Sequence, residues 1–332
     1  MNIIITILFV LLFSSILSFL GKKIKIPMVV ILISCGLIID IPLIKDFFIE
    51  PNTQFLFGLG DIALICLMFL AGMESSWNRL CKERKDSIFI AIFAATVPLL
   101  LGFSAFIMLG FPVMTSFIIG ICMSITAEAT KVRVLLDLGK LRTRVGSAMV
   151  GAGIIDDILG LFLFILITLL FNAFQFLNNL LIGGVIVAFF TGVLVQMHIG
   201  REHRIIKDSE NILIWAIVPF FFVSVGLHLD IGSMILNPSM ISIIIIIAII
   251  GKLAGSLLTK PFTNFKWKQL YLIGWAMNSR GAIEIALALI AFRSNIISIE
   301  LYSSLVIMAL VTTLMFPFII TKIIKRNPEI MN

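Results

Sequence analysis

The stretch GAGIIDDILGLFLF (Gly151–Phe164) places two neighbouring carboxylates, Asp156 and Asp157, inside an otherwise apolar run. No charged residue occurs in the eleven positions before Asp156. Burying even one carboxylate is costly unless it is paired, so two in succession indicate a function. Neighbouring carboxylates resist being ionised together, and protons and oxygen-seeking cations such as Na⁺ can therefore compete for the same oxygens.

The composition of the chain is that of a membrane protein. Of its 332 residues, 60% are hydrophobic and 13% are charged, whereas soluble domains carry roughly a quarter charged residues. The mean hydropathy is +1.17. Apolar runs close to the ~20 residues that span a bilayer recur along the chain. There are eleven: 2–20, 27–43, 55–73, 88–110, 112–129, 145–172, 178–197, 211–229, 239–258, 269–292 and 301–321. The sequence therefore predicts an all-α polytopic membrane protein with about eleven transmembrane helices.

Basic residues alternate between the connecting segments. Most of them, Lys131 included, follow odd-numbered runs, whereas the segments after even-numbered runs hold only Lys45 and Arg293. Because Lys and Arg gather on the cytoplasmic side, we expect the N-terminus outside and the C-terminus inside, in a prokaryotic cytoplasmic membrane. The formal charge of +7 then reflects topology. We expect the lipid bilayer as a partner and no nucleic acid.

An internal repeat is visible at a shift of 154 residues, which places Gly72 on Gly226 and Met123–Thr126 on Met277–Arg280. The shift maps runs two to six onto runs seven to eleven. Because five is odd, the two copies lie in opposite orientations across the bilayer. Such inverted repeats are typical of secondary transporters, which bind their substrates near the midplane at discontinuous helices.

Two of the runs contain polar patches that form helices poorly, SITAEAT (Ser124–Thr130) and NSRGAIE (Asn278–Glu284). Irregular backbone at membrane depth is tolerated only where it is buried or lines a cavity, so we expect two crossed, discontinuous helices. We also expect Arg280 to tie them together by pairing with Glu128 or Glu284. At ~1.5 Å per residue, four polar residues lie roughly 15 to 21 Å deep in a ~30 Å hydrocarbon core. These are Thr126, Asp157, Lys252 and Ser279.

The chain resembles monovalent cation:proton antiporter family 2, the group of NapA- and KefC-type Na⁺/H⁺ exchangers. Seven stretches carry the resemblance in order: KIP (25–27), LMFLAGMES (67–75), TAEATKVRVLLDLGKL (126–141), GIIDDILGL (153–161), FFFVSVGLHLD (220–230), GKLAG (251–255) and SRGAIEIAL (279–287). GIIDDILGL and FFFVSVGLHLD are the most specific. Glu128 and Lys131 depart from the usual pattern of the third stretch.

The resemblance implies a role for each site residue. Asp157 would carry the cation and the proton, and Asp156 and Asp157 would be the Na⁺ ligands, together with Thr126. Lys252 would compensate the charge of Asp156. The residues Glu128, Ser279, Arg280 and Glu284 would stabilise the crossing of the broken helices. Exchangers with two aspartates and this lysine are generally electrogenic.

The resemblance also implies an NhaA/NapA-like fold that works as a homodimer by an elevator movement. Its core would comprise about 88–172 and 239–322, and its scaffold and dimer part about 2–73 and 178–229. We expect one transmembrane domain over 1–330 without a soluble regulatory domain, and hence no KefC-like ligand gating. The expected activity is exchange of Na⁺, or of Li⁺ or K⁺, for H⁺, with a role in pH and sodium homeostasis.

Other functions remain open from the sequence. A sodium-coupled symporter of an organic solute would share the inverted architecture, and a cation channel would also place charges within the membrane. For the single acids within the runs, a purely structural role in neutralising a nearby basic residue is the alternative; these are Asp61, Glu74, Glu128 and Glu284. An enzyme is not expected, since the three histidines (His198, His203 and His228) are not arranged as ligands or bases. No cofactor is expected beyond the transported ions.

Overall fold

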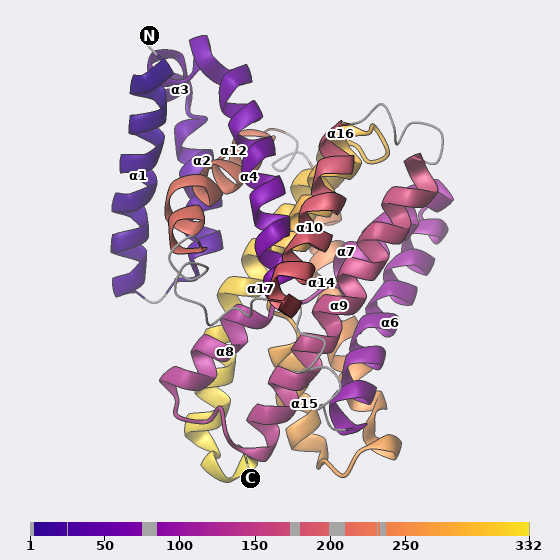
Figure 1. The fold of residues 1–332 in the computed structure, drawn as a ribbon. Coiled ribbons are helices and arrows are strands. Elements are labelled where there is room, and N and C mark those ends of the chain that lie inside the picture. The colour runs from indigo at the N-terminus through magenta and orange to yellow at the C-terminus, as the bar shows by residue number, and fades with distance from the viewer. Residues whose placement is uncertain are drawn as a thin grey trace. The chain divides into compact units, whose positions relative to one another are not determined.

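A computed structural model describes residues 3–24, 26–74, 85–172, 180–198, 210–230, 232 and 237–331. All regular secondary structure in these residues is helical, which confirms the all-α prediction. Figure 1 shows the order of the helices. The chain forms two units. The first comprises Met1–Ser76 and Thr168–Leu229, and the second comprises Trp77–Ile167 and Asp230–Asn332.

Six helices among the described residues are long and apolar enough to cross a membrane. They cover Ile3–Gly21, Glu50–Met73, Lys85–Met108, Glu210–Leu227, Pro238–Phe262 and Ile299–Arg326. A pair of helices bent by 84° would add a seventh span. The chain is therefore an integral membrane protein by the length and composition of its helices, and the figure of eleven spans stays a prediction.

The first unit begins with α1 (Ile3–Lys23), α2 (Met28–Ile39) and α3 (Pro42–Phe48). The apolar run 27–43 is thus not one straight helix, because α2 and α3 are the pair that meets at 84°. Pro42 occupies the start of α3, where its missing N–H leaves no intrahelical hydrogen bond unmade. The unit continues with α4 (Thr53–Glu74), α10 (Leu180–His198), a π-helical turn (Leu213–Ile217) and α12 (Val218–Leu227).

Glycines allow the helices of the first unit to approach each other closely. A Cβ at Gly36 of α2 would collide with the carbonyl oxygen of Val223 and lie 2.8 Å from the Cα of Gly226 in α12. A Cβ at Gly72 of α4 would collide with the carbonyl oxygen of Phe189 in α10. Small residues at such contacts let membrane helices pack backbone against backbone. The glycines that the 154-residue shift superimposes, 72 and 226, thus both lie at close helix contacts.

The second unit contains the helices that carry the conspicuous charges. They are α6 (Lys85–Met108), α7 (Val113–Ser124), α8 (Glu128–Asp137), most of α9 (Arg144–Asn172), α14 (Pro238–Leu258), α15 (Trp267–Ala276), α16 (Ala282–Arg293) and α17 (Ile299–Arg326). Helix α14 packs against α6, α15 and α17. Gly251 and Gly255 of α14 lie against Pro98 and Ala94 of α6, respectively. This close packing holds Lys252, which follows Gly251, inside the unit.

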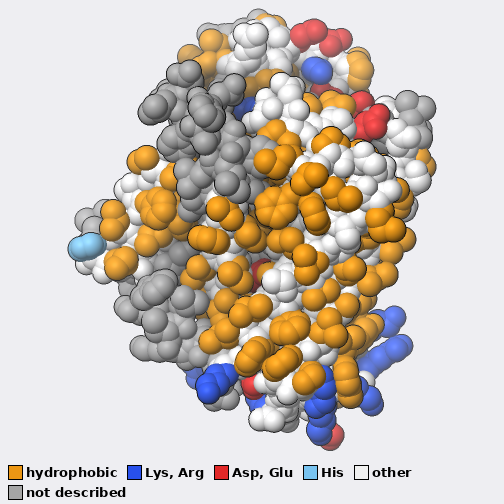
Figure 2. Space-filling view, turned by 90° about the vertical axis from the view of Figure 1, so that its right-hand side faces the viewer, with side chains coloured by type: hydrophobic (Ala, Val, Ile, Leu, Met, Phe, Trp, Pro, Cys, Tyr) orange, Lys and Arg blue, Asp and Glu red, His pale blue; other side chains and the backbone are white. Residues whose placement is uncertain are grey.

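Exposed apolar side chains cover the outside of the second unit. Among them are Ile92, Leu100, Leu101, Ile246, Ile250 and Leu258, on α6 and α14. Figure 2 shows hydrophobic side chains across the middle of one face and Lys and Arg side chains gathered at its lower end. The exposed Lys85, Lys266 and Lys268 begin α6 and α15. An apolar band bounded by basic residues suits a surface that faces lipid.

Candidate ion-binding site

Two helices of the second unit are broken, at the two patches where the sequence predicts it. Helix α7 ends at Ser124, and α8 begins at Glu128. Helix α15 ends at Ala276, and α16 begins at Ala282. The shift of 154 residues places the first gap, 125–127, within the second, at 279–281. The two halves of the repeat therefore break at corresponding positions.

The two breaks are hydrogen-bonded to each other. The N–H of Ala127 donates to the carbonyl of Ser279 at 2.9 Å, and the hydroxyl of Ser279 donates to the carbonyl of Ala127 at 2.7 Å. The hydroxyl of Thr126 donates to the carbonyl of Met277 at 3.2 Å. A Cβ at Gly281 would lie 2.7 Å from that of Ala127. Backbone groups that the breaks release are thus paired with one another, which a buried break requires.

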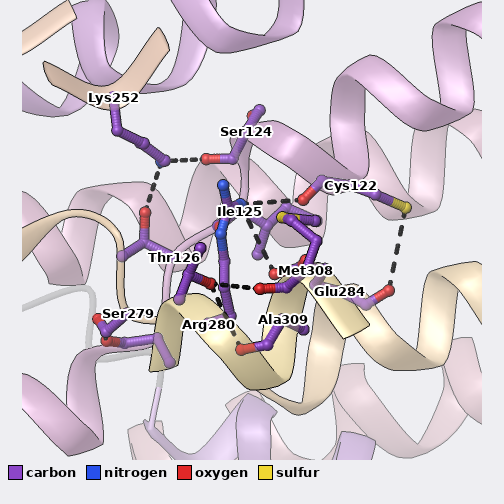
Figure 3. A network of polar contacts seen from close by, with 12 residues as sticks. Cys122, Ser124, Ile125, Thr126, Lys252, Ser279, Arg280, Glu284, Met308 and Ala309 are labelled. Carbon is purple, nitrogen blue, oxygen red and sulfur yellow. Dashed lines mark hydrogen bonds and ion pairs between the residues drawn. The ribbon is translucent and has the colours of Figure 1, made fainter. Parts of the chain in front are cut away.

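Arg280 binds the end of α7 (Figure 3). Its Nη1 donates to the carbonyls of Cys122 and Ile125 at 3.0 and 2.7 Å, and it lies 3.6 Å from Glu284 Oε2. The residue is 1% exposed. A cation at the carboxyl end of a helix satisfies free carbonyls and balances the negative end of the helix dipole. Of the two partners expected for Arg280, the structure therefore places Glu284 beside it.

Lys252 reaches the same helix end from α14. Its Nζ donates to the carbonyl of Ser124 and, at 2.5 Å, to the hydroxyl of Thr126 (Figure 3). It lies 3.6 Å from Asp156 Oδ2, which is an ion pair without a hydrogen bond. Lys252 is fully buried and Asp156 is 1% exposed. Three of the residues expected at the site, Thr126, Asp156 and Lys252, thus meet at the first break.

The Asp156 carboxylate lacks hydrogen-bond donors among the described residues, and neither of its oxygens accepts a hydrogen bond from them. An ionised carboxylate at 1% exposure is stable only with close partners, so an arriving proton or cation would find its oxygens available. Asp157 follows in α9, but its side chain lies outside the described part of the structure.

Some features of this site are not visible as residue types in the sequence. The carbonyls of Ser124, Cys122 and Ile125 accept hydrogen bonds from the two cations, and any residue could supply them. Lys131 was expected to lie in a connecting segment, and this was wrong. It lies in α8 and is fully buried, with its Nζ 3.6 Å from Met277 Sδ. Its position five residues after Thr126, in the turn that follows the break, was the feature of the sequence that could have indicated its burial.

Broken helices that cross beside a buried acid and a buried lysine, in an all-helical membrane protein, define the architecture of a secondary ion transporter. The chain belongs to the family of transmembrane sodium/hydrogen exchangers, whose pattern it matches over residues 7–183 and 161–326. This is a family of transporters and not of enzymes. The finer assignment to antiporter family 2 stays a prediction.

Similar proteins carry matching names. A Na⁺/H⁺ antiporter of Enterococcus hirae is 27% identical over 335 residues, covering 84% of this chain and 87% of the relative. The Na⁺/H⁺-K⁺ antiporter GerN of Bacillus cereus is 25% identical over 320 residues, which cover 80% of this chain and 82% of GerN. The structure of the sodium proton antiporter MjNhaP1 from Methanocaldococcus jannaschii superimposes on this structure with a TM-score of 0.66 at 15% sequence identity. The superposition covers 96% of this chain and 95% of the MjNhaP1 chain. The two structures therefore share a fold.

The role of Arg280 leads to a prediction about stability. Arg280→Met should lower the free energy of unfolding by roughly 3–5 kcal/mol, because it leaves Glu284 and two helix-end carbonyls buried without their cation. Thermal unfolding in detergent, followed by tryptophan fluorescence, measures this. Arg326→Met, at an exposed position at the end of α17, is the matched control. Equal melting temperatures for the two variants would show that Arg280 does not hold the crossing together.

Proposed function

We propose that this chain exchanges Na⁺ for H⁺ across a membrane, with Asp156 and Asp157 as the carboxylates that bind both ions. The observation that carries the proposal is the buried Asp156–Lys252 pair at the meeting point of two broken helices. Membership of the sodium/hydrogen exchanger family supports it. The names of the antiporters from Enterococcus hirae and Bacillus cereus agree with it.

The geometry suggests how an ion would displace the lysine. Lys252 is held by the carbonyl of Ser124 and the hydroxyl of Thr126, so it can move away from Asp156 without losing a hydrogen bond to that carboxylate. A cation at the carboxylates would compete with the ammonium group for the same negative charge. The bound cation would gain the hydroxyl of Thr126 as a ligand if Lys252 withdrew. The ammonium group of Lys252 would then change its position at the end of α7 with each binding event.

The transport cycle follows the expectations from the resemblance. We propose that the core, about 88–172 and 239–322, carries the site across the membrane against a scaffold of about 2–73 and 178–229. The scaffold would form a homodimer, and the chain would cross the membrane eleven times with its C-terminus inside. Exchange would be electrogenic, with Na⁺ as the principal cation and Li⁺ or K⁺ as possible substitutes. The physiological role would be pH and sodium homeostasis.

Ion-driven proton movement tests the proposed function. We expect reconstituted protein to release protons when Na⁺ is added, with a saturable dependence on Na⁺ that is compared with Li⁺ and K⁺ across pH. A channel would conduct without a counter-ion and would not saturate in this way. A symporter would need an organic solute before Na⁺ moved. Proton release that is absent for all three cations would contradict the proposal.

A further inference from the structure

Lys131 is a second fully buried lysine in the unit that holds Asp156 and Lys252. It lies in the turn after the first break, in α8, and the sulfur of Met277 is 3.6 Å from its Nζ. A thioether is a weak acceptor, and moving an ammonium group out of water costs several kcal/mol. The sulfur alone is not sufficient compensation for this charge.

Glu128 supplies the opposite charge at the same place. It precedes Lys131 by three residues in α8, a spacing that brings side chains together on one helix face. Gly153 of α9 marks where they meet. A Cβ at that position would lie 2.7 Å from Lys131 Nζ and 3.2 Å from Glu128 Cγ. The missing side chain of Gly153 therefore leaves room for both groups.

This pair lies close to the two aspartates along α9. Gly153 precedes Asp156 by three residues and Asp157 by four, which is about one helical turn. Two lysines thus approach neighbouring positions of α9, Lys252 beside Asp156, and Lys131, with Glu128, beside Gly153. Lys252 approaches from α14, and Lys131 approaches from α8.

We propose that Lys131 acts as a tethered cation, whose ammonium group fills a second monovalent-cation subsite formed by Glu128 against Gly153. An ammonium group has the charge of a monovalent cation and a size close to that of NH₄⁺ and K⁺. Because this subsite is filled by the protein itself, only the aspartates remain for an ion from solution. The inference rests on the proposed function only in taking the aspartates as the exchange site.

The alternative is that Lys131 serves only to fill volume beside Gly153, with no requirement for its charge. Two variants separate these roles. Lys131→Ala removes the charge and opens space, so a free cation can occupy the vacated position. Lys131→Met removes the charge but keeps most of the volume, so no cation can enter. A tethered cation predicts different ion responses for the two variants, whereas a packing role predicts none.

The test is thermal unfolding of the purified full chain in NH₄⁺, K⁺, Na⁺ or choline chloride at one ionic strength. For Lys131→Ala, NH₄⁺ and K⁺ should raise the melting temperature over choline by roughly 2–4 °C at tenfold excess over the dissociation constant. Lys131→Met and the wild-type chain should lack this response to NH₄⁺. If Lys131→Ala and Lys131→Met respond alike, the proposal is wrong. If Lys131→Ala can be purified only in NH₄⁺, the proposal is supported, and failure in both NH₄⁺ and choline overturns it.

Two further variants complete the design. Asp157→Asn in the Lys131→Ala background should remove any stabilisation by Na⁺ at the aspartates but keep the response to NH₄⁺. Failure of the exchange site and failure of the second subsite are therefore distinguishable. Gly153→Ala should destabilise the wild-type chain, because its Cβ would crowd the ammonium group, and should be better tolerated with Lys131→Ala. If Gly153→Ala lowered the melting temperature equally in the wild-type chain and in Lys131→Ala, the ammonium group of Lys131 would not lie against Gly153.

Discussion

Replacement of Asp157 by Asn is expected to abolish Na⁺/H⁺ exchange while the protein still inserts and folds. Asparagine keeps the shape of the side chain but cannot carry a proton or a negative charge, so Asp156 would be the one carboxylate left at the site. Asp156 cannot substitute, because Lys252 lies 3.6 Å from it and competes for its charge. The measurement is Na⁺-dependent proton movement in proteoliposomes that contain equal amounts of each variant.

The control for this prediction is Asp137→Asn. Asp137 lies at the end of α8 and is more exposed than Asp156, so exchange should stay near the wild-type rate. Size-exclusion chromatography of both variants checks that folding is intact. Exchange at the wild-type rate in Asp157→Asn would remove this residue from the mechanism.

The second large effect expected is a dependence of transport on the membrane potential. In the proton-loaded site Asp157 is protonated and Asp156 pairs with the ammonium group of Lys252, so the three residues together carry no net charge. Binding of one Na⁺ releases two protons, one from Asp157 and one from Lys252, and leaves a net charge of −1 at the site. Exchange of two H⁺ for one Na⁺ moves one charge, worth ~2.3 kcal/mol per 100 mV. An inside-negative potential should therefore drive Na⁺ out at equal pH on both sides.

The lysine provides the matched variant for this measurement. Lys252→Gln removes one proton-carrying group, so the variant, where it is active, should exchange one H⁺ for one Na⁺ and ignore the potential. Na⁺ efflux from proteoliposomes with the potential clamped by K⁺ and valinomycin gives the result. Wild-type efflux that does not change with the potential would refute the electrogenic mechanism.

The sequence was sufficient to predict several of the residues that lie near the first break. Asp156 and Lys252 stand out because a charge inside an apolar run is costly, and the breaks stand out because polar residues interrupt two runs. Depth along each run was enough to place Thr126, Lys252 and Ser279 at a similar level, since helices advance at a fixed rise per residue. The structure places all three at the breaks. Family membership and the all-helical fold were likewise accessible from composition and motifs.

What could not be predicted depends on backbone atoms and on the direction of chain segments. The carbonyls that bind Arg280 and Lys252 become available only because α7 stops at Ser124, and no residue type signals this. Lys131 was counted among basic residues of a loop, because charge counting assumes that such residues reach water. The structure instead turns the start of α8 inward, so that Lys131 is fully buried.

The hydrogen bonds between the two breaks also constrain how the protein is made. Ser279 and Ala127 are 152 residues apart, and the residues of the first unit from 168 to 229 are synthesised between them. The first half of the second unit, including Asp156, must therefore enter the membrane long before its partners emerge from the ribosome. Until Lys252 and Arg280 are synthesised, the carbonyls at the end of α7 and the Asp156 carboxylate lack their cations. These polar groups must then be shielded from lipid, and the nascent chain must be protected from degradation. Late steps of biogenesis, rather than early ones, should limit the yield of this protein.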